Sequence, residues 1–241
     1  MAQRLKSQMT MESPSAIAID MGGTHLRGAL VNCQGEILFQ HKEKTNAEND
    51  SRGIISQICE LVESVREKAS QKQIIGVGLS APGPIDTKNG IILGSYNIPG
   101  MRNLAIRDLL QSRLCLPVVL ENDGIAAAIG EWQYGAAIGC TDYVYVSIGT
   151  GIGGGGIVNG KPLRGRDGFA GHFGHMVIIA DGEKCSCGNL GCWEAYGCGP
   201  ALLRSLAANG YKDFESFLKQ TLENAASTET VLNSYGDVIG L

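Results

Sequence analysis

The feature that most constrains this chain is a strand, glycine-turn, strand pattern that occurs twice. An ungapped shift of 127 residues aligns the segment that ends at Asn32 with the segment that ends at Asn159. The aligned pairs are Ile17 with Val144, Ile19 with Val146, Gly22 with Gly149, Gly28 with Gly155, Leu30 with Ile157, Val31 with Val158 and Asn32 with Asn159. Such internal similarity indicates one supersecondary unit used twice. We therefore expect two similar lobes, with a glycine turn on each side of one ligand.

The rest of the apolar pattern alternates between strand and helix periods. Apolar residues at Ile54, Ile58, Leu61, Val62 and Val65 predict an amphipathic helix over residues 53–69. The other expected strands are 16–20, 26–31, 36–40, 74–79, 118–120 and 143–148, and the other expected helices are 104–114, 124–134 and 214–222. The alternation predicts an α/β fold.

Composition excludes several classes of protein. The 241 residues carry 20 basic and 24 acidic side chains, a net charge of −4, which argues against a basic nucleic-acid-binding surface. The uncharged stretch 143–160 is crowded with glycines, so we expect no membrane span. Residues 1–15 lack the apolar segment of a secretory signal and read as a flexible tail. We expect a cytoplasmic protein with no nucleic-acid or membrane partner.

The two glycine turns have the chemistry of phosphate-binding loops. Their backbone N–H groups can approach a polyphosphate closely, and Thr24 and Thr150 add hydroxyl donors. A dinucleotide-binding site is rejected because residues 157–159 continue as a strand, where that site needs a helix. A Walker loop is rejected because neither turn contains Gly-Lys-Ser/Thr.

Two carboxylates at strand ends have open roles on the sequence alone. Asp123 lies in Glu-Asn-Asp-Gly at 121–124, between a strand and a helix, where it can project into a cleft or serve as a helix N-cap. Asp20 can be a turn residue, or it can hold magnesium through water near phosphates.

The strongest local signal is a group of metal-ligand residues. His175, Cys185, Cys187 and Cys192 have the spacing H-x9-C-x-C-x4-C, with Gly188 and Gly191 for sharp turns. Three thiolates and one imidazole match tetrahedral zinc. The alternative is a set of scattered buried thiols. Cys33, Cys59, Cys115 and Cys140 are expected to be core fillers, and Cys198 is surplus to four-coordination.

Seven motifs together resemble the ROK family of sugar kinases, within the actin-like ATPase superfamily. They are DMGGTHLRG (20–28), GLSAPGPID (78–86), NIPG (97–100), ENDG (121–124), IGTGIGGGGIVNG (148–160), GHM (174–176) and CSCGNLGCWEAYG (185–197). They follow the family order over residues 16–200. The resemblance implies a two-lobed actin-like (ribonuclease H-like) fold, with an N-terminal lobe over 16–121 and a C-terminal lobe over 122–241 that is shortened at its end.

The resemblance also implies a role for individual residues. Asp123 would be the general base, as a side chain poised to take a proton from the sugar hydroxyl. ATP phosphates and Mg2+ would be held by Asp20, Gly22, Gly23, Thr24, Thr150 and Gly151. Sugar would be bound by Gly83, Asn97, Asn122, Asp123, His172, His175 and Glu194. His175 would use one ring nitrogen for Zn2+ and the other for a sugar hydroxyl.

Two departures from the family pattern bear on activity. His172 stands where the family usually has Glu, and a neutral imidazole accepts one hydrogen bond where a carboxylate accepts two. The family also continues beyond the position of Leu241 with helices that pack on both lobes. Their absence would expose apolar surface on the second lobe and favour a partner, a homodimer or poor solubility, and of these we expect a homodimer.

The resemblance therefore implies an ATP-dependent transferase of carbohydrate metabolism. It would phosphorylate the 6-hydroxyl of glucose, mannose, N-acetylmannosamine or N-acetylglucosamine. The alternative is a weak or inactive kinase that binds sugar as a sensor. A DNA-binding repressor of the family is disfavoured, because fifteen tail residues cannot hold a helix-turn-helix module.

Overall fold

The computed structural model describes residues 14–46, 51–69, 73–94, 100–224 and 228–239. The chain forms two compact units, one of residues 1–126 with 165–169 and one of residues 127–164 with 170–241. The division expected between residues 121 and 122 stays a prediction. No helix among the described residues is long and apolar enough to cross a membrane.

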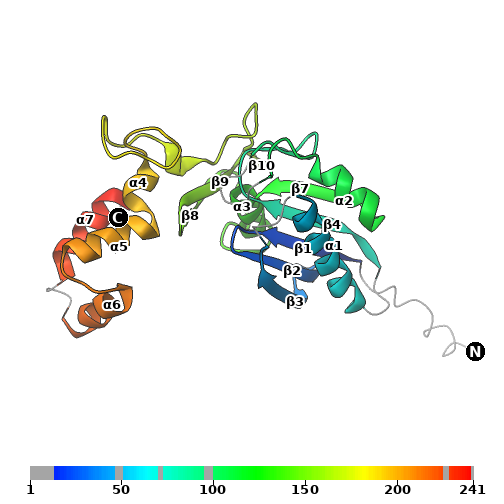
Figure 1. Ribbon diagram of the computed structural model, residues 1–241, viewed down its shortest axis with the longest axis horizontal. Helices are drawn as coiled ribbons and strands as arrows, with labels where there is room; N and C mark the ends of the chain where they lie inside the picture. Colours follow the sequence, from blue (N-terminus) through cyan, green and yellow to red (C-terminus); the bar gives the residue numbers. More distant parts are fainter. Residues whose placement is uncertain (1–13, 47–50, 70–72, 95–99, 225–227, 240–241) are drawn as a thin grey trace, which may run out of the picture. The chain divides into compact units, whose positions relative to one another are not determined.

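The first unit is built on a five-stranded sheet in the order β3-β2-β1-β4-β7 (Figure 1). Its elements are β1 (Ser15–Met21), β2 (His25–Asn32), β3 (Ile37–Lys44), α1 (Ser51–Glu67), β4 (Ile74–Ala81), β5 (Ile85–Asp86), β6 (Ile91–Ile92), α2 (Ile106–Leu114) and β7 (Val118–Asn122). β1 pairs antiparallel with β2 and parallel with β4, and β4 pairs parallel with β7. The strands predicted at 16–20, 26–31, 36–40 and 74–79 are confirmed as β1 to β4.

The core of the first unit lies between one face of this sheet and the helices α1 and α2. Alternate strand residues point to this face, so Ile17, Ile19, Val77 and Leu79 are buried with the apolar side of α1. Gly28 of β2 lies directly against α1, because a Cβ there would meet the Leu61 side chain at 2.8 Å. The glycine permits the helix to approach the strand.

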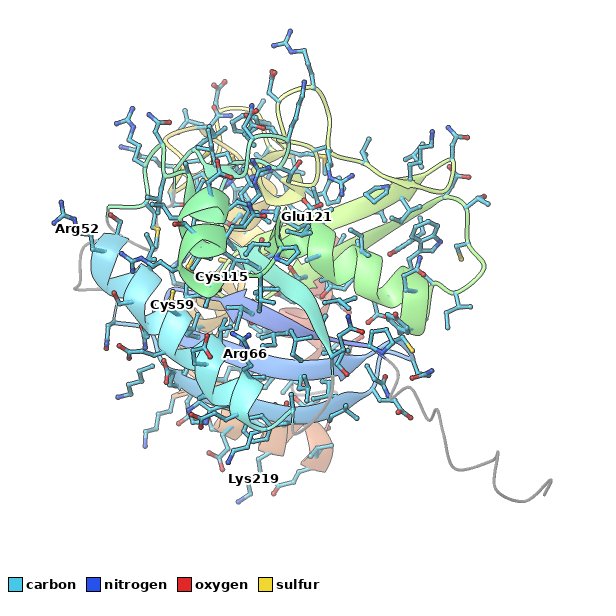
Figure 2. All side chains as sticks on the ribbon, turned by 90° about the vertical axis from the view of Figure 1, so that its right-hand side faces the viewer. Arg52, Cys59, Arg66, Cys115, Glu121 and Lys219 are labelled. Carbon is cyan, nitrogen blue, oxygen red and sulfur yellow. The ribbon has the colours of Figure 1, made fainter. Side chains whose placement is uncertain are left out.

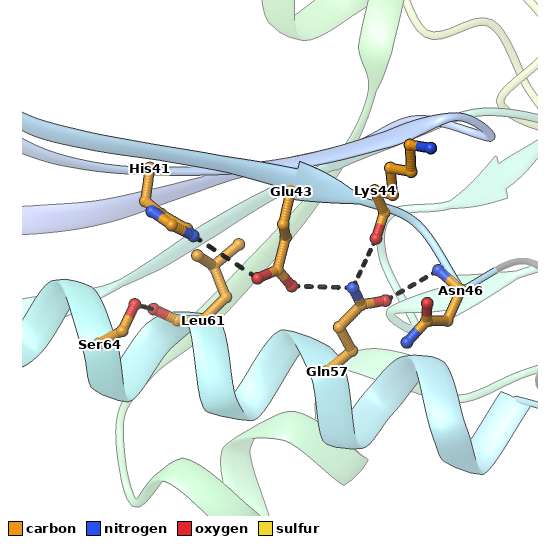
Figure 3. Close-up of polar contacts among 7 residues, drawn as sticks. All are labelled: His41, Glu43, Lys44, Asn46, Gln57, Leu61 and Ser64. Atoms are coloured by element: carbon orange, nitrogen blue, oxygen red, sulfur yellow. Dashed lines mark hydrogen bonds and ion pairs between the residues drawn. The ribbon is translucent and has the colours of Figure 1, made fainter.

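A polar network attaches the edge strand β3 to α1 (Figure 3). The buried Gln57 amide donates to Glu43 Oε1 at 2.8 Å and to the Lys44 carbonyl at 2.8 Å. Its oxygen accepts the Asn46 backbone N–H at 3.1 Å. A buried amide has to satisfy its donors and acceptor, so this network fixes the register between β3 and the helix.

The second unit combines a small sheet with a helical segment. α3 (Asp123–Tyr134) begins in the first unit and continues into the second. The further elements are β8 (Tyr143–Ile148), β9 (Ile152–Val158), β10 (Lys161–Pro162), the 3-10 helix η1 (Phe173–His175), α4 (Trp193–Gly197), α5 (Gly199–Ala208), α6 (Phe214–Glu223) and α7 (Glu229–Ile239). The sheet order is β10-β9-β8.

Two hydrogen bonds fasten α7 onto α4, beside α5 (Figure 1). The Trp193 indole N–H donates to the Val238 carbonyl at 2.8 Å, and the Tyr235 hydroxyl donates to the Gly197 carbonyl at 2.6 Å. Both aromatic side chains thus contribute apolar area while their polar atoms find partners.

The repeated pattern folds as a hairpin in both units, but the register differs by one residue. Ile17 lies opposite Leu30 in the first hairpin, whereas Val144 lies opposite Gly156, not Ile157, in the second. The second turn is one residue shorter, which the ungapped alignment hides. Burial differs as well, since Ile17 is 0% exposed and Val144 is 59% exposed.

Two expectations about single residues need correction. Ser15, assigned to the flexible tail, is buried in β1, while residues 1–13 lie outside the described residues. Cys33, Cys115 and Cys140 are exposed, so they are not core fillers. Cys115 follows α2 in a left-handed conformation, and of these four residues Cys59 packs against the core of the first unit. Cys59 lies on α1 (Figure 2).

We expect Gly28→Ala to destabilise the protein by about 1–3 kcal/mol, because the new methyl group has to displace the buried Leu61 side chain. Urea denaturation measures the change. Gly78→Ala is the matched control, since a Cβ at this strand glycine would meet nothing within 4 Å. Equal effects of the two substitutions would contradict the packing argument.

Candidate functional site

The predicted metal ligands come together in the second unit. The ligand atoms of His175, Cys185, Cys187 and Cys192 all lie within 4.8 Å of one another. Cys187 Sγ and Cys192 Sγ are 3.7 Å apart, and Cys185 Sγ is 3.7 Å from His175 Nδ1. Two sulfurs at about 2.3 Å from one tetrahedral Zn2+ lie about 3.8 Å apart. The donor set and its spacing fit zinc.

The environment of the Cys192 thiol opposes its ionisation unless a cation is bound. Burial raises the pKa of the Cys192 thiol to about 12, and the neighbouring Cys187 and Cys185 thiols act in the same direction. By contrast, the backbone N–H of Asn189 lowers the pKa of the exposed Cys187 thiol by a hydrogen bond. A metal ion that binds here has to displace at least the Cys192 proton. The buried Cys198 packs instead with Ile152 and Ala201, so it is a core residue.

Two glycines bring the segment 171–175 against β9. A Cβ at Gly171 would lie 2.6 Å from the Gly154 carbonyl oxygen, and one at Gly174 would lie 2.3 Å from the Ile152 carbonyl oxygen. This close main-chain approach sets the position of His175. The rings of His172 and His175 stack at 24° with centroids 6.5 Å apart. The structure thus brings two of the predicted sugar-binding residues together.

The turn between β8 and β9 is fastened at both ends within the second unit. The Gly149 N–H donates to the Gly151 carbonyl at 2.9 Å, and the Gly199 N–H donates to the Gly149 carbonyl at 2.7 Å. The Ile152 N–H donates to Glu194 Oε2 at 2.9 Å. Thr150 is exposed within this turn. Glu194, predicted to bind sugar, therefore contacts the backbone beside two predicted phosphate-binding residues, Thr150 and Gly151.

In the first unit, Asp20 lies near the end of β1, just before the corresponding turn. The Gly22 N–H donates to the His25 carbonyl at 2.9 Å, and the Thr45 hydroxyl donates to the Gly22 carbonyl at 2.7 Å. These bonds hold the turn that contains Gly23 and the exposed Thr24. Asp20 forms an ion pair with Arg27 at 2.6 Å and accepts a hydrogen bond from Ser80 at 3.5 Å.

Sequence analysis missed Arg27 and Ser80. Both are register partners of Asp20, Arg27 across the hairpin and Ser80 on the parallel strand β4. The observed four-residue turn, 22–25, places Arg27 opposite Asp20, whereas the predicted strand bounds leave a five-residue turn that would pair Asp20 with Leu26. The strand pattern therefore located Arg27 to within one residue. Ser80 had no such signal, because the pairing of β1 with β4 is non-local.

The sequence left open whether Asp123 caps a helix or projects as a free-standing functional carboxylate, and the structure gives the cap to its neighbour Asn122. Asn122 is buried, its Oδ1 accepts the Ile125 N–H at 3.2 Å, and its Nδ2 donates to the Gly83 carbonyl at 3.3 Å. It therefore caps α3. Asp123 is exposed, and its Oδ1 accepts the Gly124 N–H at 2.8 Å.

Of the other predicted sugar-binding residues, Gly83 has φ +98, a backbone conformation that favours glycine. Asn97 lies outside the described residues.

An open pocket of about 730 Å³ lies on the sheet of the first unit. Ala18, Gly78 and Val119 line its apolar part, on the strand positions that alternate with the buried core residues. Asp20, Arg27, Ser80 and Glu121 line its polar part. Glu121 is labelled in Figure 2. Asp20 and its partners Arg27 and Ser80 therefore line an open pocket.

Comparison with known proteins identifies a family with the same motifs. The ROK family model matches residues 16–241. A glucokinase of Thermotoga maritima is 38% identical over 202 residues, which cover 84% of this chain and 62% of the relative. A xylose repressor of Bacillus subtilis is 34% identical over 230 residues, which cover 94% of this chain and 59% of the repressor. The chain thus spans less than two thirds of either relative.

A solved structure shares the fold. The crystal structure of a ROK family glucokinase from Streptomyces griseus in complex with glucose and AMPPNP has a TM-score of 0.78 and 31% identity. The match covers 94% of this chain and 77% of that chain. The predicted α/β fold class of the actin-like superfamily is confirmed.

We expect the purified protein to contain about one zinc ion per chain. Cys192→Ser should weaken zinc binding by more than about 100-fold, since changes beyond the ligands themselves already cost about 10- to 100-fold. Elemental analysis and titration with a chromophoric chelator measure this. Cys140→Ser, which changes an exposed thiol of the same unit, should retain the metal. Retention of zinc by the Cys192 variant would contradict the site.

Zinc affinity should also fall as the pH is lowered. The raised pKa keeps the metal-free Cys192 thiol protonated at neutral pH, so metal binding releases a proton and acid opposes it. We expect the apparent dissociation constant to rise about tenfold for each pH unit and each proton released. Chelator competition, corrected for the chelator's own titration, measures the slope. A pH-independent constant would contradict thiolate ligation.

Proposed function

The chain belongs to the ROK family, and on this premise we propose that it transfers the γ-phosphoryl group of ATP to a sugar hydroxyl. The acceptor is the 6-hydroxyl of a hexose or an N-acetylhexosamine: glucose, mannose, N-acetylmannosamine or N-acetylglucosamine. Similarity to a glucokinase over 84% of the chain supports the reaction class. The homodimer and the cytoplasmic location remain predictions from the sequence.

The observation that carries the proposal is the environment of Asp123. Its carboxylate is exposed at the first turn of α3, while the preceding Asn122 provides the helix cap and holds the Gly83 carbonyl. Since the cap is already supplied, Asp123 is not required for that role. A carboxylate held at a fixed helix start is suited to accept a proton from a substrate hydroxyl.

In the proposed reaction Asp123 accepts the proton of the sugar hydroxyl as that oxygen attacks the γ-phosphorus. The bond from the γ-phosphorus to the bridging oxygen breaks, and ADP leaves with the electron pair. Backbone N–H groups of the two glycine turns, with the Thr24 and Thr150 hydroxyls, are proposed to bind phosphate oxygens. Positioning and charge stabilisation account for most of the catalysis of phosphoryl transfer.

Asp20 is proposed to bind the magnesium ion of the nucleotide. A single carboxylate, with water and phosphate oxygens, is a usual protein contribution to Mg2+. The Asp20 side chain is 45% exposed beside the open pocket, and its ion pair with Arg27 fixes its orientation. When bound, Mg2+ neutralises charge on the phosphates.

The residues proposed to bind sugar are described unit by unit. Gly83, Asn122 and Asp123 lie together in the first unit, and His172, His175 and Glu194 lie in the second; Asn97 completes the set. His172 replaces a carboxylate acceptor by an imidazole, which accepts a single hydrogen bond when neutral. We therefore expect sugar preference to depend on this position.

A second candidate function is sugar binding without turnover. It is favoured by one observation, the 34% identity with a xylose repressor over 94% of this chain. In that case the sugar residues would act in a sensor, and phosphoryl transfer would be weak or absent. Sugar-dependent thermal stabilisation without ADP release distinguishes the sensor from the kinase.

We expect Asp123→Asn to lower turnover by about 10²- to 10⁴-fold while sugar binding persists, because the amide cannot accept the proton. ADP release with ATP and Mg2+ across a panel of hexoses and N-acetylhexosamines measures this. Asp142→Asn, at another exposed carboxylate, is the control and should retain activity. Turnover by the Asp123 variant equal to that of the native chain would contradict the assignment. No turnover from the folded, zinc-loaded native chain would favour the sensor.

A further inference from the structure

The Glu194 carboxylate joins two loops that are far apart in the sequence. Its Oε2 accepts the Ile152 N–H of the glycine turn at 2.9 Å, and its Oε1 accepts the Ser186 hydroxyl at 3.1 Å. A Cβ at Gly151 would lie 2.5 Å from Oε2. All these residues belong to the second unit. One side chain therefore contacts both the turn at 149–151 and the Cys-x-Cys segment.

On the turn side, the contact is an anchor for the start of β9. Ile152 is 4% exposed and packs with Cys198 and Ala201, so its N–H lies in an apolar environment. A backbone N–H there needs an acceptor, and a carboxylate is a strong one. The other end of the turn is held by the Gly199 N–H on the Gly149 carbonyl. The conformation of the turn thus depends on where Glu194 is held.

On the metal side, Ser186 lies between the ligands Cys185 and Cys187. Ligation of both neighbours by one ion restricts the backbone at position 186 and therefore the position of its hydroxyl. Ser186 Oγ also lies 3.9 Å from Cys185 Sγ. Glu194 itself follows the ligand Cys192 by two residues, in the first turn of α4. A bound metal would therefore restrict the Glu194 carboxylate in two ways, through the Ser186 hydroxyl and through the start of α4, which follows Cys192.

We propose that Glu194 is a positioning residue through which occupancy of the metal site orders the glycine turn at 149–151. This rests on the proposed function only for its consequence, which is that metal loss weakens the binding of the nucleotide phosphates. The coupling itself belongs to the second unit and does not require turnover. Glu194 acts through the backbone it holds, whether or not it also contacts sugar.

The test measures amide hydrogen exchange of Gly151 and Ile152 by NMR, in the full chain without nucleotide. Each variant is compared with Zn2+ bound and after removal of Zn2+ by a chelator. In the native chain we expect exchange at Ile152 to accelerate by about tenfold or more when the metal is removed. In Glu194→Ala, exchange should be fast with zinc bound and should change little on removal.

Two further variants separate the effect of the Ser186 hydroxyl from a general effect of losing a side-chain contact in this loop. Ser186→Ala removes the hydroxyl contact but no ligand or turn contact, so it should reduce the metal dependence at Ile152 while zinc content stays at the native level. Glu183→Ala is the matched control: it changes a carboxylate of the same loop, whose side chain is 3.5 Å from Arg204, and should behave like the native chain. It also reports whether the loop tolerates loss of a carboxylate.

The outcomes distinguish the proposal from its rivals. Exchange at Ile152 that does not respond to zinc in the native chain overturns it. Equal metal dependence in Glu194→Ala and the native chain also overturns it, because the effect would then pass through the backbone of α4. Since no arm involves ATP or sugar, failure of the kinase assay leaves this result standing, and failure of the coupling leaves the kinase proposal standing.

Discussion

The main-chain contact between segment 171–174 and strand β9 determines where the chemistry of the second unit lies. Gly171 and Gly174 allow their backbone to meet the carbonyls of Gly154 and Ile152, at positions where a Cβ would lie 2.6 and 2.3 Å from those oxygens. Because His175 directly follows, this contact sets its imidazole beside the Cys185 thiol. The same strand begins at Ile152, whose N–H is held by Glu194.

This contact also explains part of the crowding of glycines in the stretch 143–160. Only residues 149–151 form the turn, whereas Gly153, Gly154, Gly155 and Gly156 belong to β9. Gly154 lies so close to the Tyr145 carbonyl and the Phe173 ring that a side chain would collide with both. The run of glycines therefore serves two purposes, a turn open to a ligand and a strand that is packed closely on its neighbours.

The sequence predicted the five strands of the main sheet, the helices α1 and α2 and the clustering of His175, Cys185, Cys187 and Cys192, because these features are encoded locally, but it did not predict the short strands β5 and β6. Apolar periodicity defined α1 and the strands, and the spacing of one histidine and three cysteines defined the cluster. What escaped prediction depends on non-local pairing. Tertiary packing produces the one-residue difference in hairpin register and the contact of Ser80 with Asp20. It also produces the hydrogen bond between Ser186 and Glu194. The exposure of Cys33 and Cys140 likewise depends on where each element lies in the unit.

The close approach of Glu194 to Gly151 has a consequence for variation among related chains. The backbone of Gly151 is outside the left-handed region, so its φ does not itself demand glycine. A Cβ there would lie 2.5 Å from the Glu194 carboxylate, so the Glu194 side chain would have to shift and its hydrogen bonds to Ile152 and Ser186 would change. The set of residues tolerated at position 151 therefore depends on the side chain at position 194, and the two substitutions are not additive. We therefore expect epistasis between positions 151 and 194, because loss of the carboxylate would remove the steric limit on a side chain at position 151.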